Sequence, residues 1–303
     1  MRFLRAAYKL WTSSAKFRVG LSIMGILVVL GAGQSILVPI IGDGEDPLEI
    51  AAYKQWLPPS SDHLLGTDRY GRDVLAMTLV ALVASLKVGA VAGVLSTIVG
   101  VIVAFVAGYK GGLLDAILAT ITEMFLVVPS FPLLLTLSAY VRAVNLAHVA
   151  LMLTVFSWPF AARTSRAQVL SLRSRPYVDL ARVSNLSDLE IIFQELLPNV
   201  LPYIGLGFAN AALGAIFALM GLEVIGLGPS ETLSLGIMLN WAIGWGALSL
   251  GAWPMLVAPA VPLVLLFTGM TLINISLEET YNPRLREVAR IEAPRGNGDG
   301  ELH

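Results

Sequence analysis

Long uncharged apolar stretches are the feature that most limits what this chain can fold into. A helix that crosses a bilayer needs about 20 mostly apolar residues, each rising about 1.5 Å through about 30 Å of hydrocarbon. Five such stretches lie at residues 19–41, 88–109, 116–141, 143–162 and 196–222. The third contains one charge, Glu123, and the other four contain none. Charged residues make up 14% of the chain, against about a quarter in soluble domains. The sequence therefore predicts an all-α, polytopic membrane protein.

A sixth apolar region, residues 232–277, is long enough for either one or two crossings. Its first part, residues 234–247, contains asparagine, glycine and two tryptophans, which suit the headgroup region better than the lipid tails. We therefore predict one span at residues 253–275, preceded by an interfacial, re-entrant or loop segment. The total is then about six transmembrane helices.

The distribution of basic residues supports six spans and sets their orientation. With six spans, fifteen basic residues fall on one side of the membrane and four on the other. The crowded side holds Arg2, Arg5, Lys9, Lys16, Arg18, Lys110, Arg163, Arg166, Arg173, Arg175, Arg182, Arg284, Arg286, Arg290 and Arg295. Basic loops stay in the cytoplasm, so both termini are predicted to be cytoplasmic in a cell-membrane protein. A seventh span would place the four arginines of the tail outside.

These spans divide the chain into five predicted parts. Residues 1–18 form a cytoplasmic segment, 19–41 the first span, 42–86 an external loop, 87–287 a core of about five helices, and 288–303 a disordered tail.

The same residues argue against several classes of function. There is no phosphate-cradling G-x-x-x-x-G-K-[ST] motif, so ATP hydrolysis would need another chain. Zero cysteines and three histidines predict no metal site, and the balanced charge predicts no nucleic-acid partner. Without paired acids, a Ser/His pair or H-E-x-x-H, we expect no enzyme activity and no cofactor on this chain.

The cytoplasmic loop at residues 163–199 contains two helix signals separated by a turn signal. Pro176 suits a first helical turn, and Asn185 tolerates the left-handed conformation that ends helices. Between them, one mildly apolar face at helical spacing consists of Tyr177, Leu180, Ala181 and Ser184, with Asp179 and Arg182 off it. Ser187-Asp188-Leu189-Glu190 is a capping box that begins a second short helix, which runs to Leu197, and Pro198 marks the passage from it into the fifth span. The prediction is two short helices at an angle, which either rest on the membrane or dock on a partner protein.

Several motifs, taken in their order along the chain, favour docking on a partner protein. The loop carries Tyr177-Val178-Asp179-Leu180-Ala181-Arg182, Asn185, Ser187-Asp188, Ile191-Ile192 and Leu197-Pro198-Asn199. Elsewhere stand Leu65-Gly66-Thr67-Asp68 with Gly71-Arg72-Asp73-Val74, Trp158-Pro159 with Ala162-Arg163 and Arg166-Ala167-Gln168, and Gly226-Leu227-Gly228 with Gly236-Ile237-Met238-Leu239. Together these resemble the permeases of binding-protein-dependent ABC importers, and most closely the second permease of the dipeptide/oligopeptide branch.

That resemblance implies a type I ABC importer permease whose loop is a coupling helix that docks on an ATPase subunit. The residues implied in ATPase coupling are Tyr177, Asp179, Leu180, Ala181, Arg182, Asn185, Ser187 and Asp188. The implied partners are a second permease, two cytoplasmic ATPases that bind ATP and Mg²⁺, an extracytoplasmic solute-binding protein, and membrane lipid. The chain departs from the family at Asp179 and Asn185, where glutamate and glycine are usual, and at Leu219, where an acid is usual.

Three residues are candidates for the translocation path. Two of them are glutamates, and ionisable groups within spans are costly and often functional. The third is Trp241. Glu123 fits gating or pairing between helices, with a structural role as the alternative. Glu223 could face cargo, for example a peptide amino terminus or sugar hydroxyls, or could reach out of the membrane to water. Trp241 suits an interfacial belt as well as the path.

Two further questions stay open at this stage. Glycines in the second and fifth spans allow close helix approach, either within the chain or at the interface with the second permease. Peptide is the default cargo of the branch, but oligosaccharides, nickel complexes or other solutes are alternatives. A secondary transporter that works without ATPases is a rival class, although the sequence contains no internal repeat.

Overall fold

The computed structural model describes residues 12, 14–42, 44–140, 145–228 and 232–281. Within these ranges the regular structure is helical, and β-structure is limited to an isolated bridge between Thr67 and Asp73. The helices are α2 (Ala15–Ala32), α3 (Gln34–Ile41), α4 (Val74–Lys110), α5 (Gly112–Val127), α6 (Ser130–Tyr140), α7 (Leu146–Arg173), α8 (Pro176–Val183), α9 (Asp188–Glu190), the π-helix η1 (Ile191–Leu196), α10 (Leu197–Val224), α11 (Leu235–Gly244) and α12 (Pro254–Tyr281).

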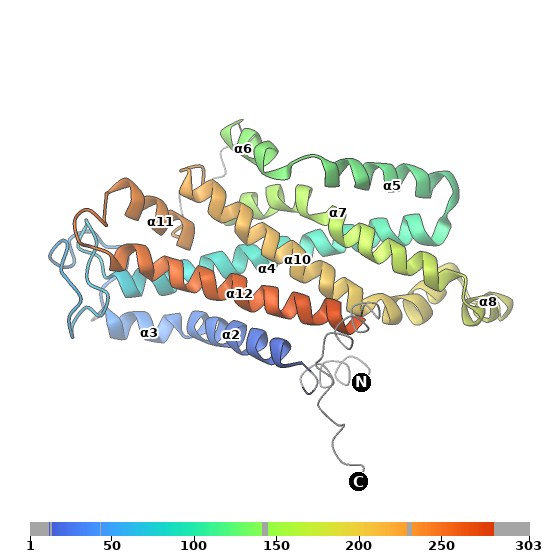
Figure 1. Ribbon diagram of the computed structural model, residues 1–303, viewed down its shortest axis with the longest axis horizontal. Helices are drawn as coiled ribbons and strands as arrows, with labels where there is room; N and C mark the ends of the chain where they lie inside the picture. The colour runs from blue at the N-terminus through green and yellow to red at the C-terminus, as the bar shows by residue number, and fades with distance from the viewer. Residues whose placement is uncertain (1–11, 13, 43, 141–144, 229–231, 282–303) are drawn as a thin grey trace, which may run out of the picture.

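The long helices lie roughly side by side and give the molecule two ends (Figure 1). We call one the α8 end, where α8 lies, and the other the loop end, where residues 42–73 and α11 lie. The start of α2 and the end of α12 meet near the α8 end. There Ser276 donates a hydrogen bond to Ser14 at 2.8 Å, and Lys16 pairs with Glu279. The predicted tail at 288–303 and most of the predicted segment at 1–18 lie outside the described residues.

Four helical segments in the described ranges are long and apolar enough to cross a membrane: Ala15–Ala32, Val74–Lys110, Asp188–Val224 and Pro254–Thr280. The bent pair α5–α6 makes a fifth if it counts as one span. The predicted fourth span lies in α7, which has 28 residues but carries three arginines in its second half. The all-α, multi-span architecture predicted from the sequence is confirmed.

The first predicted span is interrupted at Gly33. α2 already begins at Ala15, where Ser14 caps it by accepting a hydrogen bond from Phe17 N. It packs on α12 at Gly20, where an added Cβ would lie 2.7 Å from Gly269 O. That close approach requires glycine at position 20.

Helix α4 begins at Val74 and so occupies the last part of the predicted external loop at 42–86. Its 37 residues span about 55 Å at about 1.5 Å per residue. Asp73 accepts a hydrogen bond from Ala76 N at 2.9 Å and caps the helix. The sequence placed the start too late because Lys87 interrupts the apolar run, whereas the cap that starts the helix lies fifteen residues upstream of the predicted span.

The third predicted span, residues 116–141, is wrong as one straight helix. α5 and α6 meet at 84° across Val128 and Pro129. Val128 is extended, with ψ 127°, as the residue before a proline tends to be. α5 follows one side of the bundle beside α7, while α6 turns away from that line (Figure 1).

Helices α4, α7 and α10 form the centre of the bundle. Their shared core contains Val88 and Ala92 from α4, Leu153 from α7, and Ala215 and Leu219 from α10. The segment predicted as interfacial, re-entrant or loop forms α11, a ten-residue helix that lies near the end of α10, and α12 follows it as a single long helix (Figure 1).

The glycines of α4 face neighbouring helices of the same chain. A Cβ added at Gly89 would meet Ile216 of α10 at 2.5 Å, and one at Gly100 would meet Ala161 of α7 at 2.8 Å. Gly205 and Gly214 of α10 have nothing within 4 Å of an added Cβ. The structure therefore assigns the α4 glycines to internal packing and leaves two α10 glycines on the surface.

Candidate functional sites

Helix α8 has one face buried against the chain and one face exposed. Val178 and Ala181 are buried together with Ile191, Leu196 and Val200. On the other side, Leu180 is 67% exposed and Val183 is 82% exposed. The predicted apolar face is thus wrong in part, because Ala181 points inward while Val183, which was not predicted to belong to that face, points outward. Both apolar pairs have i, i+3 spacing, so the pattern alone does not say which one is covered.

Tyr177 lies at the edge of the buried cluster. Its side chain is half-buried, and its hydroxyl has no hydrogen-bond partner within the described chain. Burial raises the pKa of the Tyr177 phenol above its ordinary value, and the nearby Glu195 carboxylate raises it further, whereas Arg175 opposes the shift. Of the predicted coupling residues, Asp179, Leu180, Arg182, Asn185, Ser187 and Asp188 are exposed.

The turn after α8 forms as predicted. Asn185 has φ 59°, in the left-handed region that asparagine tolerates better than most residues. The turn is closed by Leu186 N, which donates to Ala181 O at 3.2 Å. The capping box is also present: Ser187 N donates to Glu190 Oε2 at 2.8 Å, and Glu190 N donates to Ser187 Oγ at 3.4 Å.

The predicted second helix is not short, because it continues without a break into the fifth span. α9, η1 and α10 form one continuous helical segment, Asp188–Val224. Pro198 lies at the start of α10 and does not end the helix. In a regular helix its ring would clash with the carbonyl four residues earlier, and the segment before it is the wider π-helix η1, which ends at Leu196. We call residues 176–193 the elbow, since α8 and the start of this long helix meet there at the Asn185 turn.

The elbow is attached to the end of α4 by polar contacts. Tyr109 donates a hydrogen bond from its hydroxyl to Asp188 Oδ1 at 2.7 Å. The Arg182 guanidinium carbon lies 5.9 Å from the centre of the Tyr109 ring and also pairs with Asp179 at 3.1 Å. Arg173 donates to Gly108 O at 2.8 Å. A rigid base therefore holds the exposed apolar side chains of the elbow, which also include Leu189 and Phe193.

Glu123 pairs with an arginine of the neighbouring helix. Its Oε2 accepts from Arg163 Nη1 at 3.5 Å, and the two side chains are 53% and 62% exposed. Nearer the α8 end, Arg166 makes a two-pronged contact with Asp115 at 2.6 and 2.8 Å. These pairs join α5 to α7. Glu123 thus lies on the surface of the bundle, which agrees with the pairing between helices that the sequence suggested.

At the loop end, the motif at residues 65–74 folds into a compact cap on α4. Arg72 donates to Asp68 Oδ2 through Nε at 2.8 Å and Nη2 at 2.5 Å, and both side chains are buried. Asp73 also contacts His63 Nδ1 at 2.9 Å. Gly71 has φ 71°, and an added Cβ would lie 2.0 Å from Tyr53 O, so only glycine fits.

Trp241 lies against this cap. The Arg72 guanidinium carbon is 4.7 Å from the centre of the Trp241 ring, within reach of a cation–π contact. Trp241 also stacks on Trp245, with centroids 5.5 Å apart and planes 12° apart. Arg72 was not predicted as a functional residue, and only its place in the motif Gly71-Arg72-Asp73 could have indicated it.

Glu223 is buried, with 1% of its surface exposed, and does not reach out to water. Its carboxylate accepts hydrogen bonds from the Ser234 side chain and the Gly236 backbone at the start of α11. An added Cβ would lie 2.5 Å from the Glu223 side chain at Gly228 and 2.4 Å from it at Gly236. Glu223 therefore fixes the N-terminus of α11, where a negative charge is favourable.

Glu223 and Trp241 come together in one open pocket of about 370 Å³ at the loop end, whereas Glu123 lies elsewhere. Arg72, Ile237 and Asn240 also line the pocket. Asn240 is held by a hydrogen bond from its side chain to Val224 O at 2.8 Å. The pocket thus combines a cation, an acid, an amide and an indole.

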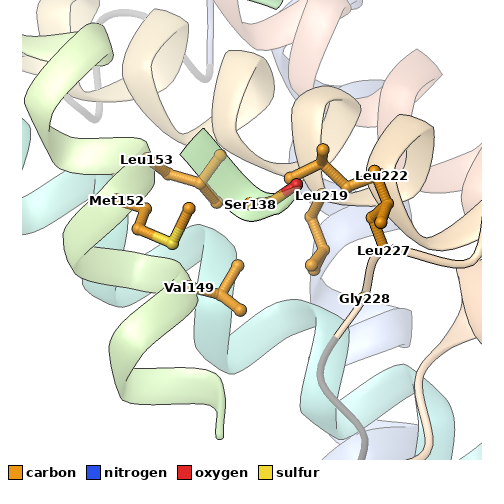
Figure 2. A pocket seen from close by; sticks show the side chains of 8 residues that line it. All are labelled: Ser138, Val149, Met152, Leu153, Leu219, Leu222, Leu227 and Gly228. Atoms are coloured by element: carbon orange, nitrogen blue, oxygen red, sulfur yellow. The ribbon is translucent and has the colours of Figure 1, made fainter. Parts of the chain in front are cut away.

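Leu219, which stands where the resemblance leads one to expect an acid, faces an apolar seam between α6, α7 and α10. Figure 2 shows it beside Leu153, Met152 and Val149, with Leu222 next to it on α10. The seam has no room for a water molecule, so a carboxylate here would be buried without solvent. The acid one turn later, Glu223, occupies a polar environment instead. Among the described residues, no group of three or more His, Asp or Glu side chains is placed to hold a metal ion.

Sequence comparison gives the class of protein to which this helical bundle belongs. Residues 96–287 match the family described as the inner membrane component of binding-protein-dependent transport systems. The chain belongs to this family and is a permease of the type I ABC importer class.

Relatives in three genera are similar over most of their length. The chain is 31% identical to a putative peptide transport system permease of Brucella suis biovar 1, covering 89% of this chain and 88% of the relative. It is also 31% identical to the oligopeptide transport system permease OppC of Mycobacterium tuberculosis, covering 90% and 93%. Identity to the dipeptide transport system permease DppC of Bacillus subtilis is again 31%, covering 91% and 85%.

Proposed function

We propose that this chain is one of two permeases that form the transmembrane pore of an ATP-driven peptide importer. The observation that carries the proposal is the elbow, where Leu180 and Val183 are exposed on a helix whose other face is buried in the chain. Exposed apolar side chains on a rigid, polar-anchored support suit a protein partner. That partner is a cytoplasmic ATPase, and a second ATPase engages the second permease.

The proposed orientation places the α8 end in the cytoplasm, with both termini on that side. The start of α2, the elbow and the end of α12 all lie at this end, as do most of the basic residues within the described ranges. The loop end then faces the extracytoplasmic solute-binding protein. Closure of the ATPases on ATP moves the elbows, and the pore alternates between inward-facing and outward-facing states because ATP binds the two states with different affinity. ATP and Mg²⁺ are bound by the ATPases, and this chain carries out no bond chemistry.

The Glu123–Arg163 pair is proposed to face the water-filled path. Glu123 lies eleven residues after the first residue of α5, or about 16 Å along the helix from the α8 end. Both side chains are more than half exposed, and charged groups at such depth avoid lipid. Water between the two permeases supplies the polar surroundings that the pair needs. The exposed Gly205 and Gly214 of α10 suit close contact with the second permease.

At the loop end, the proposed contact with cargo is through Trp241 and the pocket beside it, with Glu223 as its support. The carboxylate has one oxygen without a hydrogen-bond partner in the described residues, but the side chain is enclosed by Gly228 and Gly236. Its main task is to hold α11, and through α11 Trp241, in position.

Peptide cargo is supported by the names of the three relatives, each of which refers to peptide, oligopeptide or dipeptide transport. Oligosaccharides, nickel complexes and other solutes are the alternatives that the family resemblance leaves. The test uses the full assembly in proteoliposomes with its solute-binding protein and ATP. We expect ATP-dependent accumulation of a radiolabelled oligopeptide, and no accumulation of an oligosaccharide of similar mass. Accumulation of the oligosaccharide alone would overturn the cargo, and accumulation without ATPases would overturn the mechanism.

A further inference from the structure

The contact between Tyr109 and Asp188 joins two segments that are 79 residues apart in the chain. Tyr109 is the last residue but one of α4, and Asp188 is the first residue of α9. The hydroxyl-to-carboxylate distance is 2.7 Å, in the short range typical of a hydrogen bond to a charged acceptor. The family resemblance implies a role for Asp188 in ATPase coupling, whereas in the structure its Oδ1 bonds to its own chain.

Other contacts hold the same end of α4 in a fixed relation to the elbow. The Tyr109 ring packs against the buried cluster under α8, together with Leu172 and Leu186. Arg182 of α8 lies over the ring, and Arg173 of α7 bonds to Gly108 O. The Tyr109 hydroxyl therefore makes one of several contacts, and its partner Asp188 belongs to the part of the elbow that continues into α10.

The opposite end of α4 lies at the pocket. α4 is unbroken from Val74 to Lys110, and its glycines fit closely against α7 and α10. Arg72, two residues before the helix, contacts Trp241 of α11. A shift of α4 along its axis would therefore move the cap and the side of the pocket that Trp241 forms.

We propose that Tyr109 is a positioning residue for energy coupling, and that its hydrogen bond to Asp188 carries motion of the elbow into α4. This inference rests on the proposed function as an ATP-driven importer. Asp188 then acts inside the permease, whereas Leu180 and Val183 contact the ATPase.

The test measures import and ATP hydrolysis in the same proteoliposomes, using the complete assembly. Tyr109→Phe removes the hydroxyl and keeps the ring. We expect this variant to assemble with the ATPases and to hydrolyse ATP, while imported peptide per ATP falls about fivefold or more, the lower range of coupling between distant sites. Asp188→Asn keeps an acceptor oxygen and should lose less than Asp188→Ala. The double variant Tyr109→Phe/Asp188→Ala should be no worse than Asp188→Ala alone, because both changes break one contact.

Tyr140→Phe serves as the matched control, since this tyrosine ends α6 and its side chain is 86% exposed. Its import per ATP should equal that of the wild type. The proposal is overturned if Tyr109→Phe leaves the ratio unchanged, or if import and hydrolysis fall in equal proportion because the assembly is lost. Weakened ATPase association in Asp188→Asn would also overturn it in favour of direct contact. Failure of the wild-type assembly to import any peptide would instead contradict the proposed function.

Discussion

The two ends of the molecule differ in which side chains are buried and which are exposed. At the loop end, ionisable side chains are buried and bonded within the chain, as with Asp68 on Arg72 and Glu223 on the start of α11. At the α8 end, the charged pair of Asp179 and Arg182 is exposed, and so are the apolar Leu180 and Val183. A buried charge with internal partners stabilises the chain itself, whereas an exposed apolar side chain on a rigid support gains energy only from a partner. The buried groups of the loop end thus have their partners within the chain, whereas the exposed apolar side chains of the elbow do not.

The largest effect on stability is expected at the loop end. Arg72→Ala leaves the fully buried Asp68 carboxylate without its cation, so the free energy of unfolding should fall by about 3 to 5 kcal/mol. Thermal unfolding of the purified chain in detergent measures this. The matched control is Arg182→Ala at the α8 end, whose exposed pair should contribute less than about 1 kcal/mol. Equal losses in the two variants would contradict the distinction between the ends.

A second comparison separates the two faces of α8. Val178→Ala opens a cavity in the buried cluster, and we expect a loss of about 2 to 3 kcal/mol in the free energy of unfolding. Leu180→Ala removes an exposed side chain and should change stability by less than about 0.5 kcal/mol. If Leu180 is central to the ATPase contact, its truncation should weaken ATPase binding about tenfold or more, measured by titration of the purified subunits. The reverse pattern would mean that the faces are assigned wrongly.

A third comparison concerns glycines inside and outside the bundle. Gly100→Ala places a Cβ 2.8 Å from both Ala161 Cβ and Trp158 O, so it should destabilise the chain by about 1 to 3 kcal/mol. Gly205→Ala meets nothing and should be neutral, or stabilising by up to about 1 kcal/mol, in the isolated chain. The same Gly205→Ala should weaken assembly with the second permease, measured by co-purification. Unchanged assembly would remove α10 from that interface.

The last comparison sets stability against import at Glu123. Glu123→Gln breaks an exposed pair with a 3.5 Å contact, so the free energy of unfolding should change by less than about 1 kcal/mol. Import should nevertheless fall if the pair lines the path, and Arg163→Gln should have the same effect. Normal import in both variants would place this pair outside the path.

The sequence predicted best those features that depend on local chemistry. The capping box at Ser187, the turn at Asn185 and the helix after Pro176 all formed where expected, because each is decided within a few residues. Predictions that depended on tertiary packing were less accurate. Which apolar pair of α8 is covered is decided by Ile191, Leu196 and Val200, and hydropathy does not show that choice.

Helix ends show the same limit. The start of α4 is set by the Asp73 cap, which lies in a segment predicted as loop. The break between α5 and α6 is set by Pro129, which lies within a run predicted as one continuous apolar span. α9 continues into α10 through the π-helix η1, and Pro198 follows at the start of α10. Arg72 and Tyr109 were not identified in advance because their partners, Trp241 and Asp188, lie far away in the chain.

The central claim is that the elbow faces the cytoplasm and docks on an ATPase, and a single thiol tests it most directly. The chain contains no cysteine, so Val183→Cys gives one label site on it. A membrane-impermeant maleimide is added to right-side-out and to inverted vesicles, with and without the ATPase subunits. We predict labelling in inverted vesicles alone, and protection when the ATPases are bound. Labelling in right-side-out vesicles, or labelling that the ATPases leave unchanged, would contradict the account.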